Sequence, residues 1–278
     1  MWRLTFGGED HTSTNMRLKD KVVVVTGASM GIGEAVSRLF AAEGAFVVMA
    51  SRDPGHLEAA RQRVGKPEQV ATFACDVSSR QQLDSLLQFT MQRCGHVDVW
   101  TNNAGFGLVD SVEKMDMAGC RRMFDTNLFG AIEAMQLVIP VMRRQGSGTI
   151  INVSSVAGYI AVPYMAAYGA TKHALNCISK AARLELKDSG VHVVNVCPGY
   201  VKTNFSVNAV RGADRKRIGG GNVRGVTPER VARAILSGYL RNAREVVVPW
   251  RDRVAIWTYR RFPALLEAVM VRMSKSIE

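Results

Sequence analysis

Residues 22–33 read Val-Val-Val-Val-Thr-Gly-Ala-Ser-Met-Gly-Ile-Gly, an apolar run followed at once by a glycine-rich turn. An unbroken apolar run predicts a strand that is buried on both faces of a parallel sheet. Helical periodicity begins directly after the turn and stops at Gly44. A strand, a glycine-rich turn and a helix in this order predict a dinucleotide-binding unit.

The glycines of this turn have separate physical roles. Gly27 permits the tight turn, Gly31 lets the backbone approach a pyrophosphate, and Gly33 lets the helix pack on the strand. The helix N-terminus adds free amide hydrogens and the positive end of its dipole. A turn without a ligand is the alternative, which the flanking strand and helix disfavour. We therefore predict a cofactor cradle formed by Gly27, Ser29, Met30, Gly31, Ile32 and Gly33.

The rest of the chain alternates between short apolar runs and helical patterns. Further strands are predicted at Phe46–Ala50, Ala71–Ala74, Val97–Trp100, Thr149–Val153, Val191–Val196 and Glu245–Val248. Helices are predicted at Glu34–Gly44, His56–Val64, Gln81–Cys94, Met117–Gln145 (with a kink or break at Pro140) and Tyr164–Ser189, and from Pro228 behind the cap Thr227. This alternation predicts an α/β fold: one Rossmann-like, doubly wound parallel sheet of about seven strands with helices on both faces.

The 278 residues divide into three predicted parts. Residues 1–15 are polar and are expected to form a flexible leader, and residues 16–250 a single Rossmann-fold catalytic domain. Residues 251–278 are expected to form a basic, amphipathic helical extension. Between the last helices, Thr203–Thr227 has little apolar pattern and is expected to be a mobile loop or lid.

Composition narrows the class of protein. No apolar run approaches the ~20 residues that span a bilayer, so we expect a cytoplasmic protein, with association at a membrane surface left open. The five cysteines have no paired spacing, and the histidines have no metal-ligand spacing, so reduced thiols and no metal site are expected.

The net charge of +12 is uneven along the chain. Residues 1–210 carry a net charge of +3, and residues 211–278 carry +9. An electrostatic partner would therefore meet the C-terminal quarter. Nucleic acid is not an expected partner, because general basic charge is the single feature of the sequence that favours nucleic-acid binding.

The end of the second predicted strand indicates which dinucleotide binds. An NAD site usually places an acidic residue there. Its carboxylate accepts a hydrogen bond from the ribose 2′-hydroxyl and repels a 2′-phosphate. Here the strand runs into Ser51-Arg52, a hydroxyl and a guanidinium that can hold a phosphate. We predict that NADP(H) is favoured over NAD(H). The alternative is that Arg52 is a solvated charge and that Asp53 takes the ribose.

The sequence Tyr168-Gly-Ala-Thr-Lys172 follows Ser155 by thirteen residues and lies in a predicted helix. The lysine is one turn from the tyrosine on the same helical face. Tyrosine ionises near pH ~10, and a nearby positive charge favours the phenolate. Tyr168 is thus predicted to be an acid for carbonyl reduction or a base for alcohol oxidation. An isolated pair of this kind is more often a surface helix feature.

Together these residues resemble the classical short-chain dehydrogenases/reductases over about residues 18–250. The resemblance rests on Thr26–Gly33, Asp76-Val77, Asn102–Gly105, Asn127, Ser155, Tyr168, Lys172 and Pro198-Gly199. It implies catalytic roles for Asn127, Ser155 (with Ser154 the less favoured choice), Tyr168 and Lys172. Lys172 would also bind the cofactor ribose, and Asn127 would hold a water that links Lys172 to solvent.

The same resemblance implies further cofactor contacts. Asp76 and Val77 would face the adenine, and Asn103 would stabilise the central strand. The remaining cofactor-binding residues would be Ala104, Gly105, Pro198, Gly199, Val201 and Thr203. Met30 departs from the pattern, because many NADP-using members carry a basic residue there.

The last residues carry a separate apolar pattern. Phe262, Leu265, Leu266, Val269, Met270 and Met273 fall on one helical face, and Pro263 suits the helix start. Basic residues flank this face. We expect it to pack on protein, as a cover for the site or at a subunit interface. Peripheral contact with an anionic membrane surface is the alternative.

Two classes of function compete. The leading one is an oxidoreductase that acts on a carbonyl/alcohol pair, and the rival is a non-catalytic dinucleotide-binding or membrane-associated scaffold. An extended-type epimerase or dehydratase is disfavoured, because its longer substrate domain and Gly-x-x-Gly-x-x-Gly turn are missing. Resemblance to the family implies a homodimer or homotetramer. Apolar residues expected near the site favour a lipophilic substrate: Val109, Val162, Pro163, Tyr164 and Phe205.

Overall fold

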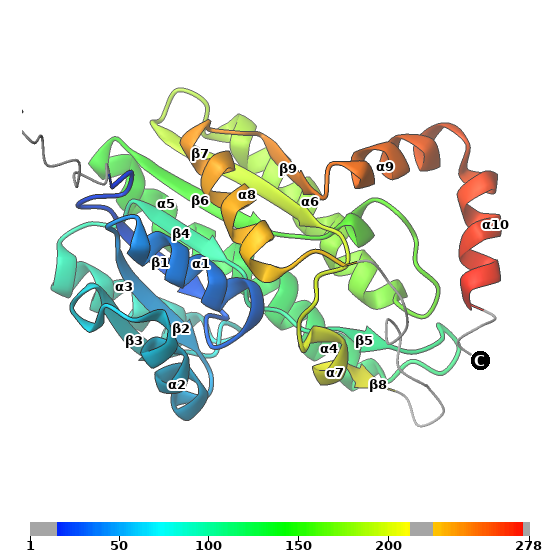
Figure 1. Cartoon of the computed structure of the whole chain (residues 1–278), viewed down its shortest axis with the longest axis horizontal. Helices are drawn as coiled ribbons and strands as arrows, with labels where there is room; N and C mark the ends of the chain where they lie inside the picture. The colour runs from blue at the N-terminus through cyan, green and yellow to red at the C-terminus, as the bar shows by residue number, and fades with distance from the viewer. Residues whose placement is uncertain (1–15, 212–224, 275–278) are drawn as a thin grey trace, which may run out of the picture.

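A seven-stranded parallel sheet forms the centre of the computed structural model, which describes residues 16–211 and 225–274. The strand order is β3-β2-β1-β4-β6-β7-β9 (Figure 1). Every predicted strand is present, and the ends differ by at most a few residues. The bounds are β1 (Val22–Thr26), β2 (Phe46–Ser51), β3 (Val70–Ala74), β4 (Val99–Asn102), β6 (Gly148–Val153), β7 (Val191–Pro198) and β9 (Glu245–Val248). The predicted doubly wound fold is confirmed.

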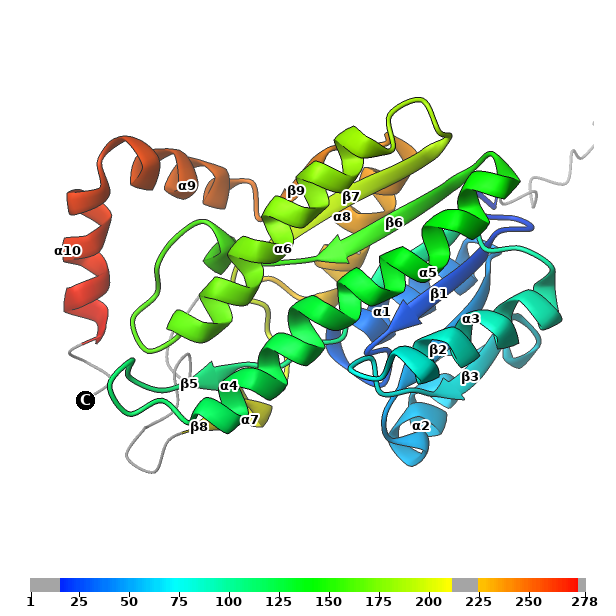
Figure 2. The ribbon, with the colours of Figure 1, turned by 180° about the vertical axis from the view of Figure 1, so that it is seen from behind.

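Alternating side chains of the strands supply two hydrophobic cores. Val23 and Val25 face one core, and Val24 faces the other, all with no exposed surface. The first core is covered by α1 (Gly31–Ala42), α2 (Pro54–Val64) and α8 (Pro228–Leu240) (Figure 1). The second is covered by α3 (Arg80–Cys94), α5 (Gly130–Gln145) and α6 (Ala166–Glu185) (Figure 2). Burial on both faces explains why the strands are continuous apolar runs.

A kink or a break was predicted at Pro140, and the structure shows no break there. It lies inside α5, which continues to Gln145. Proline cannot donate to the carbonyl of Gln136, but both residues are exposed, so water can satisfy that carbonyl. The interruption comes earlier, where α4 (Met117–Phe124) passes into a π-helical turn at Asp125–Phe129.

The segment expected to be a loop or lid contains short elements. Here α7 (Phe205–Asn208) precedes β8 (Val210–Arg211), which pairs in parallel with β5 (Leu108–Val109). Single helical turns, η1 (Pro67–Gln69) and η3 (Val156–Gly158), complete the central domain. The rest of the expected loop, residues 212–224, and the expected leader, residues 1–15, lie outside the described residues.

The C-terminal extension forms two helices where one was predicted. Helix α9 (Arg251–Arg261) leads away from the end of β9, and α10 (Pro263–Ser274) turns from it at the edge of the molecule (Figures 1 and 2). Leu266 and Met270 pack against the core of the domain, whereas Phe262, Leu265 and Val269 are exposed. The expected packing thus holds for part of the predicted face. Within residues 16–211 and 225–274, no helix is long and apolar enough to cross a membrane.

Candidate active site

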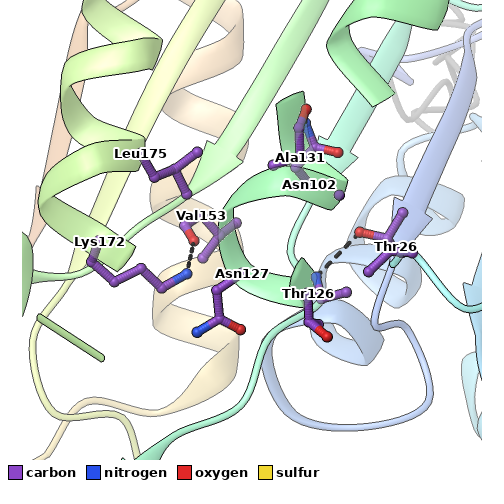
Figure 3. Close-up of a pocket in the computed structure, with 11 residues that line it drawn as sticks. Thr26, Asn102, Thr126, Asn127, Ala131, Val153, Lys172 and Leu175 are labelled. Atoms are coloured by element: carbon purple, nitrogen blue, oxygen red, sulfur yellow. Dashed lines mark hydrogen bonds between the residues drawn. The ribbon is translucent and has the colours of Figure 1, made fainter. Parts of the chain in front are cut away.

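Two of the four predicted catalytic residues, Asn127 and Lys172, line a pocket at the carboxyl ends of β1, β4 and β6. Side chains from the sheet, the π-helical turn and α6 line this pocket, with Lys172 and Asn127 on one side and Thr26 on the other (Figure 3). Ligands of doubly wound sheets bind outside this edge of the strands, near the point where strand order reverses. The pocket therefore lies where the fold class expects a ligand.

Tyr168 and Ser155 meet through their side chains. Tyr168 is buried in the first turn of α6, and its hydroxyl hydrogen-bonds with the Ser155 hydroxyl. The Ser155 Oγ also donates to the Pro198 carbonyl at 3.3 Å and accepts from the Ala157 amide at 3.1 Å. The neighbouring Ser154 Oγ instead donates to the Lys172 carbonyl at 3.2 Å. Of the two serines, Ser155 is thus the one that meets the tyrosine.

Burial dominates the ionisation of the two titratable side chains that α6 brings to the site. It raises the pKa of Tyr168 to about 12, against a smaller lowering by the Ser155 hydrogen bond. It also lowers the pKa of Lys172 to about 8. The prediction that the lysine charge lowers the pKa of the tyrosine is wrong for the chain by itself. Desolvation of the phenolate is the larger effect.

Lys172 is held in place by the adjacent strand. Its Nζ donates to the Val153 carbonyl at 2.9 Å, and only 4 % of its surface is exposed (Figure 3). The Nζ atom lies 5.8 Å from the centre of the Tyr168 ring. An ammonium group has three donor hydrogens, so Lys172 keeps donors for a ligand in the pocket.

Asn127 belongs to the π-helical turn. Its Nδ2 donates to the Phe106 carbonyl at 2.9 Å, and its Oδ1 accepts from the Phe106 amide at 3.0 Å. A Cβ built on Gly105 would come within 3.0 Å of the same Oδ1. The wider π-helical turn therefore fixes Asn127 against the segment that follows β4, beside Lys172. Such turns are frequent at functional sites.

The glycine-rich turn allows two close backbone approaches. Gly27 has φ +64°, and a Cβ on it would lie 2.8 Å from the Ala104 Cα. A Cβ on Gly33 would lie 2.3 Å from the Gly27 carbonyl oxygen. Neither position can hold a side chain without moving the backbone. The predicted reasons for glycine at these positions thus match the local geometry.

The N-terminus of α1 is open to a ligand. Met30 precedes the helix and makes no capping hydrogen bond. No acceptor of the described chain meets the amides of Gly31, Ile32 and Gly33. A Cβ built on Gly31 would lie 3.2 Å from the Thr203 Cγ2, so Thr203 borders the same turn. Free amides at a helix start fit a phosphate group, and the residues present therefore fit a dinucleotide.

Hydrogen bonds join the turn to the end of β4. The Asn103 side chain donates to the carbonyls of Thr26 and Gly27 at 2.9 and 3.1 Å. The Thr26 hydroxyl accepts from the amides of Asn103 and Ala104 at 3.0 and 3.2 Å. This role of Thr26 was not predicted, although a hydroxyl at the end of a buried apolar strand was the available signal.

The other expected cofactor residues are spread around this edge of the sheet. Val77 lines the pocket, and the Asp76 carboxylate is held by the Ser78 amide and hydroxyl at 2.9 and 2.7 Å. Val201 bridges to Val226. The last members of the set, Ser29 and Ile32, lie on the turn itself.

One residue near the site was missed. The Asp252 carboxylate of α9 lies against Gly199, since a Cβ built there would come within 1.9 Å of the Asp252 Oδ2. Burial raises the pKa of Asp252. Its position could not be foreseen, because α9 was not predicted.

The end of β2 offers a hydroxyl and a free guanidinium. Within the described part of the chain, the exposed Arg52 makes no hydrogen bond or ion pair. The Ser51 Oγ donates to the Asp53 carbonyl at 3.3 Å. The Asp53 carboxylate caps α2 by accepting from the His56 amide at 2.9 Å, and it pairs with the His56 ring at 3.1 Å. The Asp53 carboxylate therefore serves as the N-cap of α2.

Comparison with known proteins establishes the family. The family model "short chain dehydrogenase" matches residues 21–214. A Danio rerio protein named dehydrogenase/reductase SDR family member 7B is 34% identical over 268 residues, covering 93% of this chain and 87% of that protein. An uncharacterized oxidoreductase of Staphylococcus epidermidis is 33% identical over 207 residues, covering 74% and 89%.

Solved structures agree with the fold. A short-chain dehydrogenase/reductase from Burkholderia phymatum, solved in complex with NAD, superposes with a TM-score of 0.80 at 23% identity, covering 90% of this chain and 96% of that one. A short-chain dehydrogenase from Streptomyces avermitilis gives a TM-score of 0.78 at 27% identity, covering 92% and 95%. The chain belongs to the short-chain dehydrogenase/reductase family, and it is an NAD(P)-dependent oxidoreductase of that type.

Proposed function

We propose that this protein interconverts a lipophilic carbonyl compound and its alcohol, with NADP(H) favoured over NAD(H). The observation that carries the proposal is the contact between the hydroxyls of Ser155 and Tyr168, with Lys172 one helical turn away. A proton donor and a second hydrogen bond converge there, which a carbonyl oxygen that gains negative charge requires.

Each side chain has a distinct part in this proposal. The Tyr168 hydroxyl donates a proton to the carbonyl oxygen during reduction, and the Ser155 hydroxyl orients that oxygen. Lys172 holds the cofactor ribose, and Asn127 keeps the π-helical turn beside it. The nicotinamide, when bound, supplies the hydride for reduction or accepts it in the reverse direction.

Tyr168 carries the proton that reduction requires, although a raised pKa makes its hydroxyl a weaker acid. With its pKa raised to about 12, the hydroxyl is protonated at neutral pH and available for donation. Alcohol oxidation needs the phenolate, which the buried Lys172 charge would have to stabilise. The chain by itself therefore holds Tyr168 in the protonated form from which reduction starts.

The NADP preference rests on three neighbouring residues. Arg52 is exposed and unpaired within the described chain, so it is available to a 2′-phosphate, and Ser51 lies beside it. The alternative needs Asp53 to accept from the ribose, but its carboxylate is already bonded to the first turn of α2. Met30 still departs from the pattern of many NADP-using members.

An apolar wall supports a lipophilic substrate. Phe205 packs on the Tyr168 ring with centroids 5.4 Å apart, and Val162 joins the same cluster. Val109 is buried nearby in β5. Pro163 and Tyr164 continue the segment between Val162 and α6.

A screen of carbonyl compounds with NADPH and with NADH tests the proposal. We expect turnover with at least one lipophilic ketone or aldehyde, and tighter binding of NADPH than of NADH. Binding of both dinucleotides without turnover of any compound would favour the rival non-catalytic scaffold. The homodimer or homotetramer and the cytoplasmic location stay predictions, of which sedimentation and cell fractionation are the tests.

A further inference from the structure

The C-terminal helices carry an exposed apolar stripe that the catalytic proposal does not use. Its members are between 48 % and 67 % exposed, although all are large and apolar. They are Trp250, Val254 and Trp257 at α9, and Phe262, Leu265 and Val269 at α10. We call these six residues the α9–α10 stripe.

The stripe is continuous across the bend between the helices. Trp250, Val254 and Trp257 follow helical spacing along α9, and Phe262, Leu265 and Val269 do so along α10. At the bend, the rings of Trp257 and Phe262 meet edge to face, with centroids 6.3 Å apart. The two helical faces therefore form one surface.

Other side chains of both helices anchor them to the domain. Ile256 of α9 is buried with Ile160 and Val247, and Leu266 and Met270 of α10 pack against the same cluster. The stripe is thus held outward by helices that already have their own core contacts. Exposed apolar surface of this extent marks an interaction site.

The charges around the stripe are basic. Arg251, Arg261 and Arg272 are exposed and form no ion pair within the described residues. Residues 250–274 contain two acidic residues, and one of them, Asp252, is turned toward Gly199. Two tryptophans and free arginines beside an apolar face suit the boundary between lipid headgroups and acyl chains.

We propose that the α9–α10 stripe docks on an anionic lipid surface, with the helices lying in the plane of the interface. A second copy of the chain is a poorer occupant. A two-fold interface would bring the same face of each copy together, so two net basic surfaces would oppose each other. Anionic headgroups instead meet these charges with the opposite sign, while the apolar side chains enter the bilayer.

Sedimentation of the full chain with lipid vesicles tests this proposal. The probes are vesicles of phosphatidylcholine alone and vesicles of phosphatidylcholine and phosphatidylserine in equal parts. The test variant is Leu265→Glu/Val269→Glu, and the matched control is Leu184→Glu/Leu240→Glu, which places the same charges at exposed apolar positions on α6 and α8. Thermal unfolding of all three proteins reports that the fold is kept.

We expect the parent and the control to bind the anionic vesicles, with binding that weakens as salt rises. The test variant should bind at least about tenfold less well, since two apolar side chains that would enter the bilayer become charged. Equal binding by both variants, or no anionic vesicle binding by the parent, would overturn the proposal. A parent oligomer that the test variant alone dissociates, without vesicle binding, would assign the stripe to a second copy instead.

Tryptophan fluorescence gives an independent readout. In a Trp2→Phe background the remaining tryptophans are Trp250, Trp257 and Trp100, and Trp100 is already fully buried. A blue shift on addition of anionic vesicles would therefore report insertion of the stripe. An unchanged spectrum with vesicles that do sediment the protein would show that charge alone causes binding, and it would contradict docking through the stripe.

Discussion

The ammonium group of Lys172 lies 5.8 Å from the centre of the Tyr168 ring and is bonded to the Val153 carbonyl at 2.9 Å. Helix α6 supplies both side chains, and β6 supplies the carbonyl. A buried cation is thus fixed by the strand next to the proposed proton donor. The position of the Lys172 ammonium group depends on the packing of α6 against the sheet, in the second hydrophobic core.

The buried ammonium should make stability depend on pH. Below about pH 8, Lys172 is protonated in both the folded and the unfolded chain. Between about pH 8 and its ordinary pKa of 10.5, the unfolded chain still binds the proton but the folded chain does not. The free energy of unfolding should therefore rise as pH rises through this window, by about 1.4 kcal/mol per pH unit. Lys172→Met should lack this rise. Denaturant unfolding of the parent and of Lys172→Met, without cofactor and across a pH series, measures this rise. The same pH dependence of the free energy of unfolding in both proteins would refute the prediction.

The two adjacent serines should behave differently. Ser155→Ala removes the hydroxyl that meets Tyr168, so we expect turnover to fall roughly 10²-fold or more with little change in cofactor binding. Ser154→Ala removes only a hydrogen bond to the α6 backbone. It should cost about 1 kcal/mol of stability and leave turnover near the parent. Steady-state kinetics on both variants decide between them, and the reverse ranking would make Ser154 the orienting residue.

Arg52→Ala should abolish the preference for NADPH. Loss of a charge-assisted bond to a phosphate costs about 1.5–3 kcal/mol, which is roughly ten- to a hundredfold in affinity. Binding of NADH should change little. Arg144→Ala, which removes an exposed arginine at the far end of α5, is the control. Titration of both cofactors is the measurement, and equal affinities in the parent would assign NAD or dual use.

Neighbouring leucines of α10 should report which side of the helix packs. Leu266→Ser should lower the melting temperature, because Leu266 contacts the cluster around Ile256. Leu265→Ser should leave it nearly unchanged, because Leu265 is 61 % exposed. Thermal unfolding without lipid compares the two variants. Equal losses would mean that both sides of α10 are covered by protein.

Much of the fold could be predicted because parallel strands are buried on both faces. Val22–Val25 and Glu245–Val248 are recognisable as strands without any partner in view. The β5–β8 pair could not be found this way, because each strand has two residues and Leu108 meets Val210 from a distant part of the chain. Helix α9 was hidden because arginines interrupt its apolar spacing.

The site shows a similar division. Spacing and order were sufficient to bring Ser155, Tyr168 and Lys172 together, and the roles of these residues stay predictions until they are tested. Ionisation could not be foreseen, because the charge of Lys172 is visible in the sequence while the burial that opposes it is not. Pro140 was misleading because its exposure is also not visible in the sequence. On the exposed side of α5, water can bond to the carbonyl that the proline leaves without a donor, so the helix continues.

The most direct test of the proposed chemistry is the turnover of Tyr168→Phe with NADPH and a carbonyl compound that the parent reduces. The change removes only the proton-donating hydroxyl, so cofactor affinity should stay within a few-fold of the parent. Oxidation of the reduced nicotinamide, followed by its absorbance, should slow by roughly 10²- to 10⁴-fold. A variant that binds NADPH and retains full turnover would contradict the assignment of Tyr168 as the proton donor.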